Sequence, residues 1–151
     1  AGGADAVLDT GTADWRDRLK HLTGGGPAVV VEATGAPEPV TLACQVARRH
    51  GRIVLLASTR GEAPFNFYRD AHMNGITLLG AHAWAVPAKD SRPGAWTRDD
   101  ELDAFQRLLA AGRLRLDPLI TERVPAERAV QSYEAMLTWN TDMIGTLILW
   151  G

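Results

Sequence analysis

The sequence predicts an α/β fold with a doubly wound, mainly parallel β-sheet. Three short stretches are almost continuously apolar, as expected of strands that are covered on both faces of a parallel sheet: residues 28–31, 52–56 and 76–79. Segments with apolar residues at helical spacing alternate with such strands, and strands joined by crossovers of this kind run parallel. A length of 151 residues with 46% hydrophobic residues fits one domain over residues 1–151.

The first part of the chain predicts a strand, a helix and a stop. Residues 6–8 are apolar and lie between glycines and a turn, which predicts one short strand. Thr12 or Asp14 can cap the helix that follows, and three glycines at residues 24–26 end it. A phosphate-binding glycine turn would instead follow a strand and open a helix, so we interpret these glycines as a helix stop.

The rest of the chain predicts three more helices. The first has Pro37 or Pro39 in its first turn, where a missing N–H costs nothing. The second begins after Thr97 and ends at Gly112, and the third is opened by Pro125. Shorter features are predicted around the last helix: a strand at residues 119–120, a turn at residues 140–142, and a final extended segment at residues 143–150.

Two long loops follow predicted strands at the same edge of the sheet. The loop at residues 59–74 is longer than packing requires and can touch a ligand, whereas the loop at residues 82–96 covers either a site or only the sheet. Ligands of parallel α/β sheets bind beyond the carboxyl ends of the strands. The candidate site therefore consists of the residues at three strand exits: Ala33, Thr34 and Gly35; Leu56, Ala57 and Ser58; Gly80, Ala81 and His82.

Composition excludes several classes of function. Sixteen basic and eighteen acidic residues give a net charge of -2, so we expect neither nucleic acid nor an anionic membrane as a partner. No apolar stretch approaches the roughly twenty residues of a membrane span. The single cysteine, Cys44, allows no internal disulfide, which favours a cytoplasmic location. The four histidines do not stand at metal-binding spacing, so no metal site is predicted in this chain.

Six segments occur in a distinctive order: "GGADAVLD", "LTGGGPAVVVEATGAPE", "GRIVLLASTRG", "NGITLLGAH", "VPAERAVQSYEAM" and "MIGTLILW". This order resembles the carboxyl-terminal part of a medium-chain dehydrogenase/reductase, the zinc-type alcohol dehydrogenase superfamily. The resemblance covers nearly the whole chain and implies a truncated, partial domain of the Rossmann type. It also implies a parent enzyme that transfers a hydride between NAD or NADP and an alcohol or carbonyl substrate.

The resemblance implies roles for the three strand exits. Residues 33–35 would lie by the adenosine side of the cofactor, residues 56–58 under the nicotinamide-side ribose, and residues 80–82 near the nicotinamide amide. Ala57 stands where the family usually has a glycine, so its methyl group would crowd the cofactor slightly.

The glycine-rich phosphate turn, the ribose-binding acid and the zinc-binding domain of the family have no counterpart in this sequence. We therefore expect zinc only in the parent enzyme, no catalytic residue in this chain, and no turnover by the chain alone. The alternative is a non-catalytic dimerisation or interaction module derived from such an enzyme. A complete domain for another nucleotide or a methyl donor ranks last, because only Gly11 follows the first predicted strand.

Several single residues leave alternatives open. Glu32 comes too late in the chain for the ribose-binding acid, so we favour a structural hydrogen bond to a nearby loop N–H over a ligand contact. Thr34 and Gly35 either contact the cofactor or only make the turn into the next helix. His82 either contacts cofactor or substrate in the full enzyme or is a solvated loop residue.

The parent strand order of 3-2-1-4-5-6 predicts association. Without strands 1 and 2, the strand that contains Val29 to Val31 lies at an exposed edge with unpaired backbone groups. The strand from Ile76 to Leu79 is uncharged, and the resemblance implies that it pairs with a second copy, giving a homo-oligomer through an isologous contact. The alternative is that this strand lies in the interior of the sheet.

Overall fold

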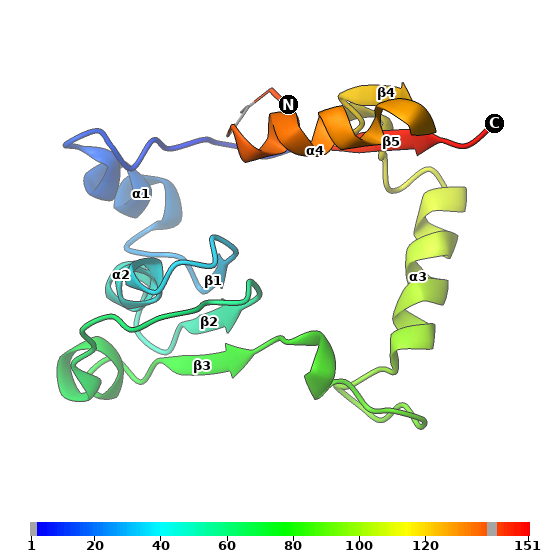
Figure 1. The fold of residues 1–151 in the computed structure, drawn as a ribbon. Coiled ribbons are helices and arrows are strands. Elements are labelled where there is room, and N and C mark those ends of the chain that lie inside the picture. The colour runs from blue at the N-terminus through cyan, green and yellow to red at the C-terminus, as the bar shows by residue number, and fades with distance from the viewer. Residues whose placement is uncertain (1–2, 139–141) are drawn as a thin grey trace. The chain divides into compact units, whose positions relative to one another are not determined.

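The structure is a computed structural model, and it describes residues 3–138 and 142–151. The chain divides into two compact units, formed by residues 4–98 and by residues 99–151 together with Gly3. Figure 1 traces both units in chain order, and each is described by itself below. Compactness alone does not decide whether two units fold separately, so the single domain over residues 1–151 stays a prediction.

A three-stranded parallel sheet forms the centre of the first unit, with its strands in the order β1-β2-β3 (Figure 1). β1 is Val29–Glu32, β2 is Arg52–Leu55 and β3 is Thr77–Gly80, and each lies within one residue of its predicted position. In the register of the sheet, Ile53 has Val30 on one side and Leu78 on the other. All three strands end at the same edge, and the predicted parallel α/β fold is confirmed.

Two helices of the first unit follow the predicted pattern. α1 is Trp15–Thr23, and it ends at Gly24, which has a left-handed φ of 65°. The N–H of Gly25 donates to the carbonyl of Lys20 over 2.9 Å, so the glycines close this helix as predicted. α2 is Glu38–Val46, has a proline in its first turn and packs against β1 and β2.

The strand predicted at residues 6–8 is wrong. These residues adopt no regular structure, and Val7 is 83% exposed. Among the described residues, no strand lies beside them to bond their backbone N–H and C=O groups. A strand without such a neighbour gains no hydrogen bonds to offset its loss of backbone entropy, so a short apolar run does not suffice to form one.

One face of the sheet is covered and the other is open. The covered face carries the core, formed by Ala43 and Cys44 of α2 with Ile53 of β2. On the opposite face Val31, Val54 and Leu79 form one row across the strands, and Val31 and Leu79 are 53% and 41% exposed. The apolar strands predict cover on both faces, but within residues 4–98 only the face toward α2 has it.

The first long loop is fastened beside α2. Its later part forms a short π-helix, Phe67–His72. The buried carboxylate of Asp70 accepts the N–H of Asn66 at 2.9 Å and pairs with Arg69 through both of its oxygens, at 2.7 and 2.9 Å. Thr41 of α2 donates its hydroxyl to the carbonyl of Pro64 over 3.0 Å. These bonds give the loop a defined path. The second long loop begins with a 3₁₀ helix, Ala83–Ala85.

The second unit contains a helix followed by a β-α-β segment (Figure 1). α3 is Arg98–Ala110, and the parallel strands β4, Glu122–Pro125, and β5, Thr146–Leu149, pair side by side. Between them, a 3₁₀ turn over Ala126–Arg128 precedes α4, Ala129–Leu137. The carboxylate of Glu122 accepts hydroxyl bonds from Ser132 of α4 and Thr146 of β5, each 3.2 Å long, and so ties this helix to its sheet.

Two further predictions concern this unit. The strand predicted at residues 119–120 is wrong, because Asp117–Leu119 forms a 3₁₀ helix and β4 begins only at Glu122. Pro118 explains the difference, since its ring sets φ near the helical value and it has no N–H for a ladder. The predicted turn at residues 140–142 lies mostly outside the described residues. Within the part of the chain that the structure describes, no helix is both long enough and apolar enough to cross a membrane.

Candidate functional site

The three predicted strand exits lie side by side at the carboxyl edge of the sheet. The N–H groups of Leu56 and Ala57 both donate to the carbonyl of Glu32, at 3.0 and 3.2 Å. At the next exit, the N–H of Ala81 donates to the carbonyl of Leu55 at 3.0 Å. These bonds extend the parallel ladders past the ends of the strands, so the backbone of all three exits is held at one edge.

Glu32 forms the polar centre of the first two exits. Only 4% of the residue is exposed, and one carboxylate oxygen accepts both the N–H of Thr34, at 2.6 Å, and the hydroxyl of Thr34. The other oxygen accepts the hydroxyl of Thr59 at 3.2 Å. The hydroxyl and N–H of Thr34 are the main reasons why the pKa of Glu32 lies below its usual value. The predicted structural bond from Glu32 to a loop N–H is confirmed.

Gly35 brings the first exit close to the second. It has a φ of 80°, which favours glycine, and a Cβ added there would lie 3.8 Å from the carbonyl oxygen of Ser58 and 3.9 Å from the Cβ of Ala57. The N–H of Arg60 donates to the carbonyl of Gly35 over 3.4 Å. The side chains of Ala33, Thr34 and Ser58 are exposed beside this contact, so the surface they form is open to a ligand.

The third exit is more open. A Cβ added to Gly80 would meet nothing within 4 Å. His82 is exposed, and its Nδ1 accepts the N–H of Trp84 over 3.1 Å at the start of the 3₁₀ helix. That bond places the proton of a neutral imidazole on Nε2, which leaves a donor toward solvent. His82 is therefore a capping residue in this structure, and its contact with a cofactor stays a prediction.

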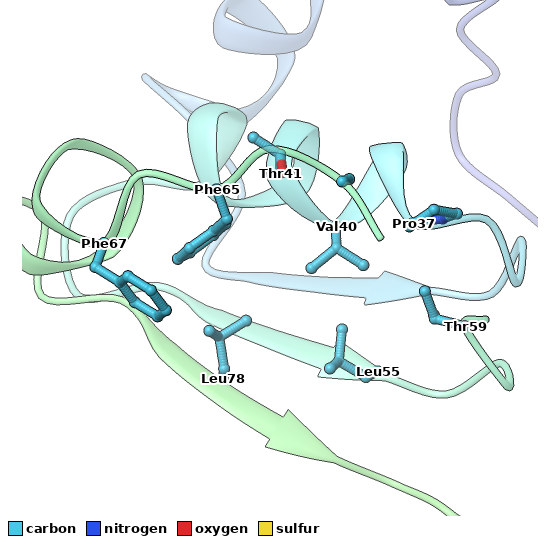
Figure 2. Close-up of a pocket in the computed structure, with 9 residues that line it drawn as sticks. Pro37, Val40, Thr41, Leu55, Thr59, Phe65, Phe67 and Leu78 are labelled. Atoms are coloured by element: carbon cyan, nitrogen blue, oxygen red, sulfur yellow. The ribbon is translucent and has the colours of Figure 1, made fainter. Parts of the chain in front are cut away.

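An apolar cavity of about 390 Å³ lies beside these exits, on the covered face of the sheet. Figure 2 shows Val40 of α2 and Leu55 and Leu78 of the sheet around one space, with Phe65 and Phe67 of the first long loop at one end. The two phenyl rings pack edge to face, with centroids 5.2 Å apart. The cavity has an uncharged lining, which suits an apolar group better than a phosphate.

Sequence reasoning missed two parts of this arrangement. Thr59 was assigned only to a loop, although it bonds Glu32 across 27 residues of sequence. The cavity was not predicted either, although the aromatic residues Phe65 and Phe67 in a loop of ligand-contacting length were the signal that could have found it.

The residues present fit one side of a dinucleotide but not its phosphates. Small residues at Gly35, Ala57 and Gly80, with open space around Gly80, allow a flat group to approach the edge of the sheet. The helix that opens beyond this edge, α2, begins with Pro37 as its cap and Pro39 in the first turn, which removes two N–H donors, and Glu38 adds a negative charge. Such a helix start disfavours an anion.

No group of three or more His, Cys, Asp or Glu side chains within residues 3–138 and 142–151 is placed to hold a metal ion. The expectation that zinc belongs to another part of the parent enzyme stays a prediction.

Three parallel strands whose exits carry small residues define the class of the first unit, which is part of a doubly wound α/β sheet of the Rossmann type. A family profile described as zinc-binding dehydrogenase matches residues 1–96. The chain therefore belongs to the zinc-binding dehydrogenase family, as the predicted resemblance implied.

Individual proteins agree with this family. L-threonine 3-dehydrogenase of Pyrococcus horikoshii is 27% identical over 147 residues, which cover 94% of this chain and 38% of the relative. Sorbitol dehydrogenase of Macaca fascicularis is 26% identical over 135 residues, covering 87% of this chain and 34% of the relative. The solved alcohol dehydrogenase from Thermotoga maritima has the same fold, with a TM-score of 0.77 at 20% identity over 99% of this chain and 38% of that one. The chain spans less than two fifths of the length of these relatives.

Proposed function

We propose that the chain is the carboxyl-terminal portion of an NAD(P)-dependent, zinc-type alcohol dehydrogenase-like oxidoreductase. The observation that carries this proposal is the meeting of three strand exits with small residues in a chain of this family. Relatives are named as dehydrogenases of L-threonine, L-galactonate and sorbitol. All three compounds carry secondary hydroxyl groups, which supports hydride transfer between a nicotinamide cofactor and an alcohol or carbonyl substrate.

The strand exits would form one wall of the cofactor site. We assign residues 33–35 to the adenosine side, residues 56–58 to the nicotinamide-side ribose and residues 80–82 to the nicotinamide amide. The open space at Gly80 supports the last assignment, and the methyl group of Ala57 beside Gly35 narrows the wall between the first two exits. The bound cofactor supplies the hydride chemistry, and these residues bind and orient it.

The chain by itself would not turn over substrate. Its glycine triplet closes α1 and so does not cradle phosphates, and the start of α2 disfavours an anion. Zinc would be held by the part of the parent that precedes this segment in the family. The proposed location is the cytoplasm, because a single cysteine allows no internal disulfide. A near-neutral net charge of -2 supports a small molecule over nucleic acid as the partner.

We also propose that the chain forms a homodimer through β3. The family resemblance implies pairing through this strand, and all four residues of β3 are exposed. The N–H groups of Thr77 and Ala81 donate toward β2, at 3.0 Å each. Because N–H groups alternate between the two sides of a strand, those of Leu78 and Gly80 face the free edge, where a second copy can pair. Among the described residues β3 has β2 as its one neighbour, which supports a position at the edge of the sheet over an interior one.

Calorimetric titration with NADH, on protein whose intact mass equals that of the 151 residues, tests the cofactor assignment. We expect no binding tighter than about millimolar, which corresponds to roughly 4 kcal/mol, because the phosphate cradle is missing. Tighter binding would contradict the view that this chain supplies only one wall of the site.

Sedimentation equilibrium tests the dimer, and together with the response to NADH it distinguishes the enzyme portion from the non-catalytic module. Leu78→Pro removes the N–H at the free edge and should give a monomer, whereas the matched control Leu78→Ala removes the side chain but keeps the N–H and should stay dimeric. Equal association of both variants would place the contact elsewhere. A stable β3 dimer whose strand exits show no response to NADH would favour the non-catalytic module.

A further inference from the structure

One carboxylate joins the two loops that leave β1 and β2. The two oxygens of Glu32 serve different loops: one bonds the hydroxyl and N–H of Thr34, and the other bonds the hydroxyl of Thr59 at 3.2 Å. The hydroxyl oxygen of Thr34 in turn accepts the N–H of Ala36 over 3.2 Å. The restraint therefore runs from the second loop, through Glu32, to the turn around Gly35 and the start of α2.

Main-chain bonds from Leu56 and Ala57 to Glu32 hold the two loops together at their base, and the links farther along the loops are weaker. Beyond the main-chain bonds at the base of the exits, the described residues of the two loops are joined by the bond from the N–H of Arg60 to the carbonyl of Gly35, which at 3.4 Å is long. The contact of Gly35 with Ala57 and Ser58 is an ordinary van der Waals approach of 3.8 to 3.9 Å for an added Cβ. The bond from the hydroxyl of Thr59 to Glu32, at 3.2 Å, is shorter than the bond from Arg60 and adds a side-chain restraint between the two loops.

The burial of Glu32 separates this role from ligand binding. With 4% of the residue exposed, its oxygens are occupied by threonine donors and are closed to solvent. A carboxylate with three donors stays ionised, and the pKa of Glu32 is accordingly lowered. The charge thus strengthens bonds to both loops without needing a cation beside it.

We propose that Glu32 is a positioning residue that acts through Thr34 and Thr59 to hold the exits of β1 and β2 at the separation required for the cofactor wall. This inference rests on the proposed function of the exits as that wall. Thr59 comes directly after the predicted exit residues 56–58 in the sequence. In this proposal it shapes the site without touching the cofactor.

Amide NMR of the full chain tests the proposal, with Thr59→Val as the decisive variant because it removes one donor and keeps the shape of the side chain. Glu32→Gln is the second variant, since its amide must turn a donor toward one of the two loops. Thr59→Ser restores the hydroxyl. The matched control is Thr41→Val, which also removes one loop bond, from the hydroxyl of Thr41 to the carbonyl of Pro64, but leaves Glu32 untouched.

Two readouts are compared among variants that are folded to the same extent, which the amide signals of β1 and β2 verify. Without ligand, Thr59→Val and Glu32→Gln should shift the amides of Thr34 and Gly35, whereas Thr59→Ser and Thr41→Val should leave them near their wild-type positions. With NADH raised to roughly ten times the expected millimolar Kd, so that a weak wild-type site responds, Thr59→Val should weaken the response of Gly35 and Ala57 by about threefold to tenfold in Kd, as expected for one lost hydrogen bond. Thr59→Ser should recover it.

The outcomes separate the two proposals. A wild-type chain whose strand exits show no response to NADH overturns the proposed cofactor wall, and with it the cofactor role of Glu32. A wild-type response that Thr59→Val leaves unchanged overturns only the positioning role. Equal effects of Thr59→Val and Thr41→Val would also overturn it, because the loss would then follow from general loosening of the loops.

Discussion

Replacement of Ile53 by alanine should be the most damaging single change in the first unit. Ile53 is fully buried and is central to a core that it shares with two small residues, Ala43 and Cys44. The change removes three carbons, worth about 2.4 kcal/mol at about 0.8 kcal/mol each, and a residual cavity brings the cost to about 2–5 kcal/mol. A unit of about 95 residues has a total stability of roughly 5–14 kcal/mol. The variant would therefore lose a large share of it.

Urea unfolding followed through the amide signals of β1 and β2 reports on this unit alone. With an m-value of about 1–2 kcal/mol per M, the midpoint should fall by about 2 M. Val31→Ala is the matched control, because Val31 lies on the opposite face and is 53% exposed. Its loss should cost about 1 kcal/mol or less. Equal losses in the two variants would refute the assignment of one covered and one open face.

Three other predictions follow from single residues. Gly26→Ala should destabilise the chain by about 1–3 kcal/mol in urea unfolding, because the φ of Gly26 is 137° and the new Cβ would lie 2.7 Å from the carbonyl oxygen of Val46. The control Gly24→Asn should cost less, because Gly24 has a φ of 65° and open space around it. The bonds from Arg69 hold the pKa of Asp70 well below its usual value, so the free energy of unfolding that they contribute should be lost as the pH falls below about 4. Asp70→Asn should therefore make the free energy of unfolding depend less on pH in this range, and an unchanged dependence on pH would argue against this role of Asp70. Burial raises the pKa of the Cys44 thiol, so iodoacetamide should modify it much more slowly in the native chain than in urea, and equal rates would contradict the buried position.

The strands of the first unit are predictable because their signal is local. Each is an apolar run bounded by glycine or proline, and each has a neighbour in the structure that completes its hydrogen bonds. The run at residues 6–8 has the same local signal but no neighbour, and it forms no strand. Pairing is a long-range property, so a pattern within a few residues does not decide it.

The candidate site divides in the same way. That three exits meet at one edge follows from parallel topology, and the bond from Glu32 to Thr34 follows from a spacing of two residues. The bond from the hydroxyl of Thr59 to the carboxylate of Glu32 could not be predicted, because it depends on the path of a loop that is itself held by distant residues such as Thr41. Hydrogen-bond networks between loops therefore cannot be predicted from the sequence, although they contribute to the shape of the site.

The open face and the free edge of the sheet offer different groups, and so we expect them to bind different partners. The row of Val31, Val54 and Leu79 exposes apolar side chains, whose contact with water costs about 25 cal/mol per Å². Relatives more than twice as long contain further chain that can cover this open face. The edge of β3 offers backbone groups, which a second copy can bond. Val31→Thr should therefore reduce aggregation of the chain, measured by light scattering, without altering a β3 dimer, whereas Leu78→Pro should do the reverse. If Val31→Thr dissolved the dimer, the open face itself would be the contact between copies, and the edge of β3 would remain free.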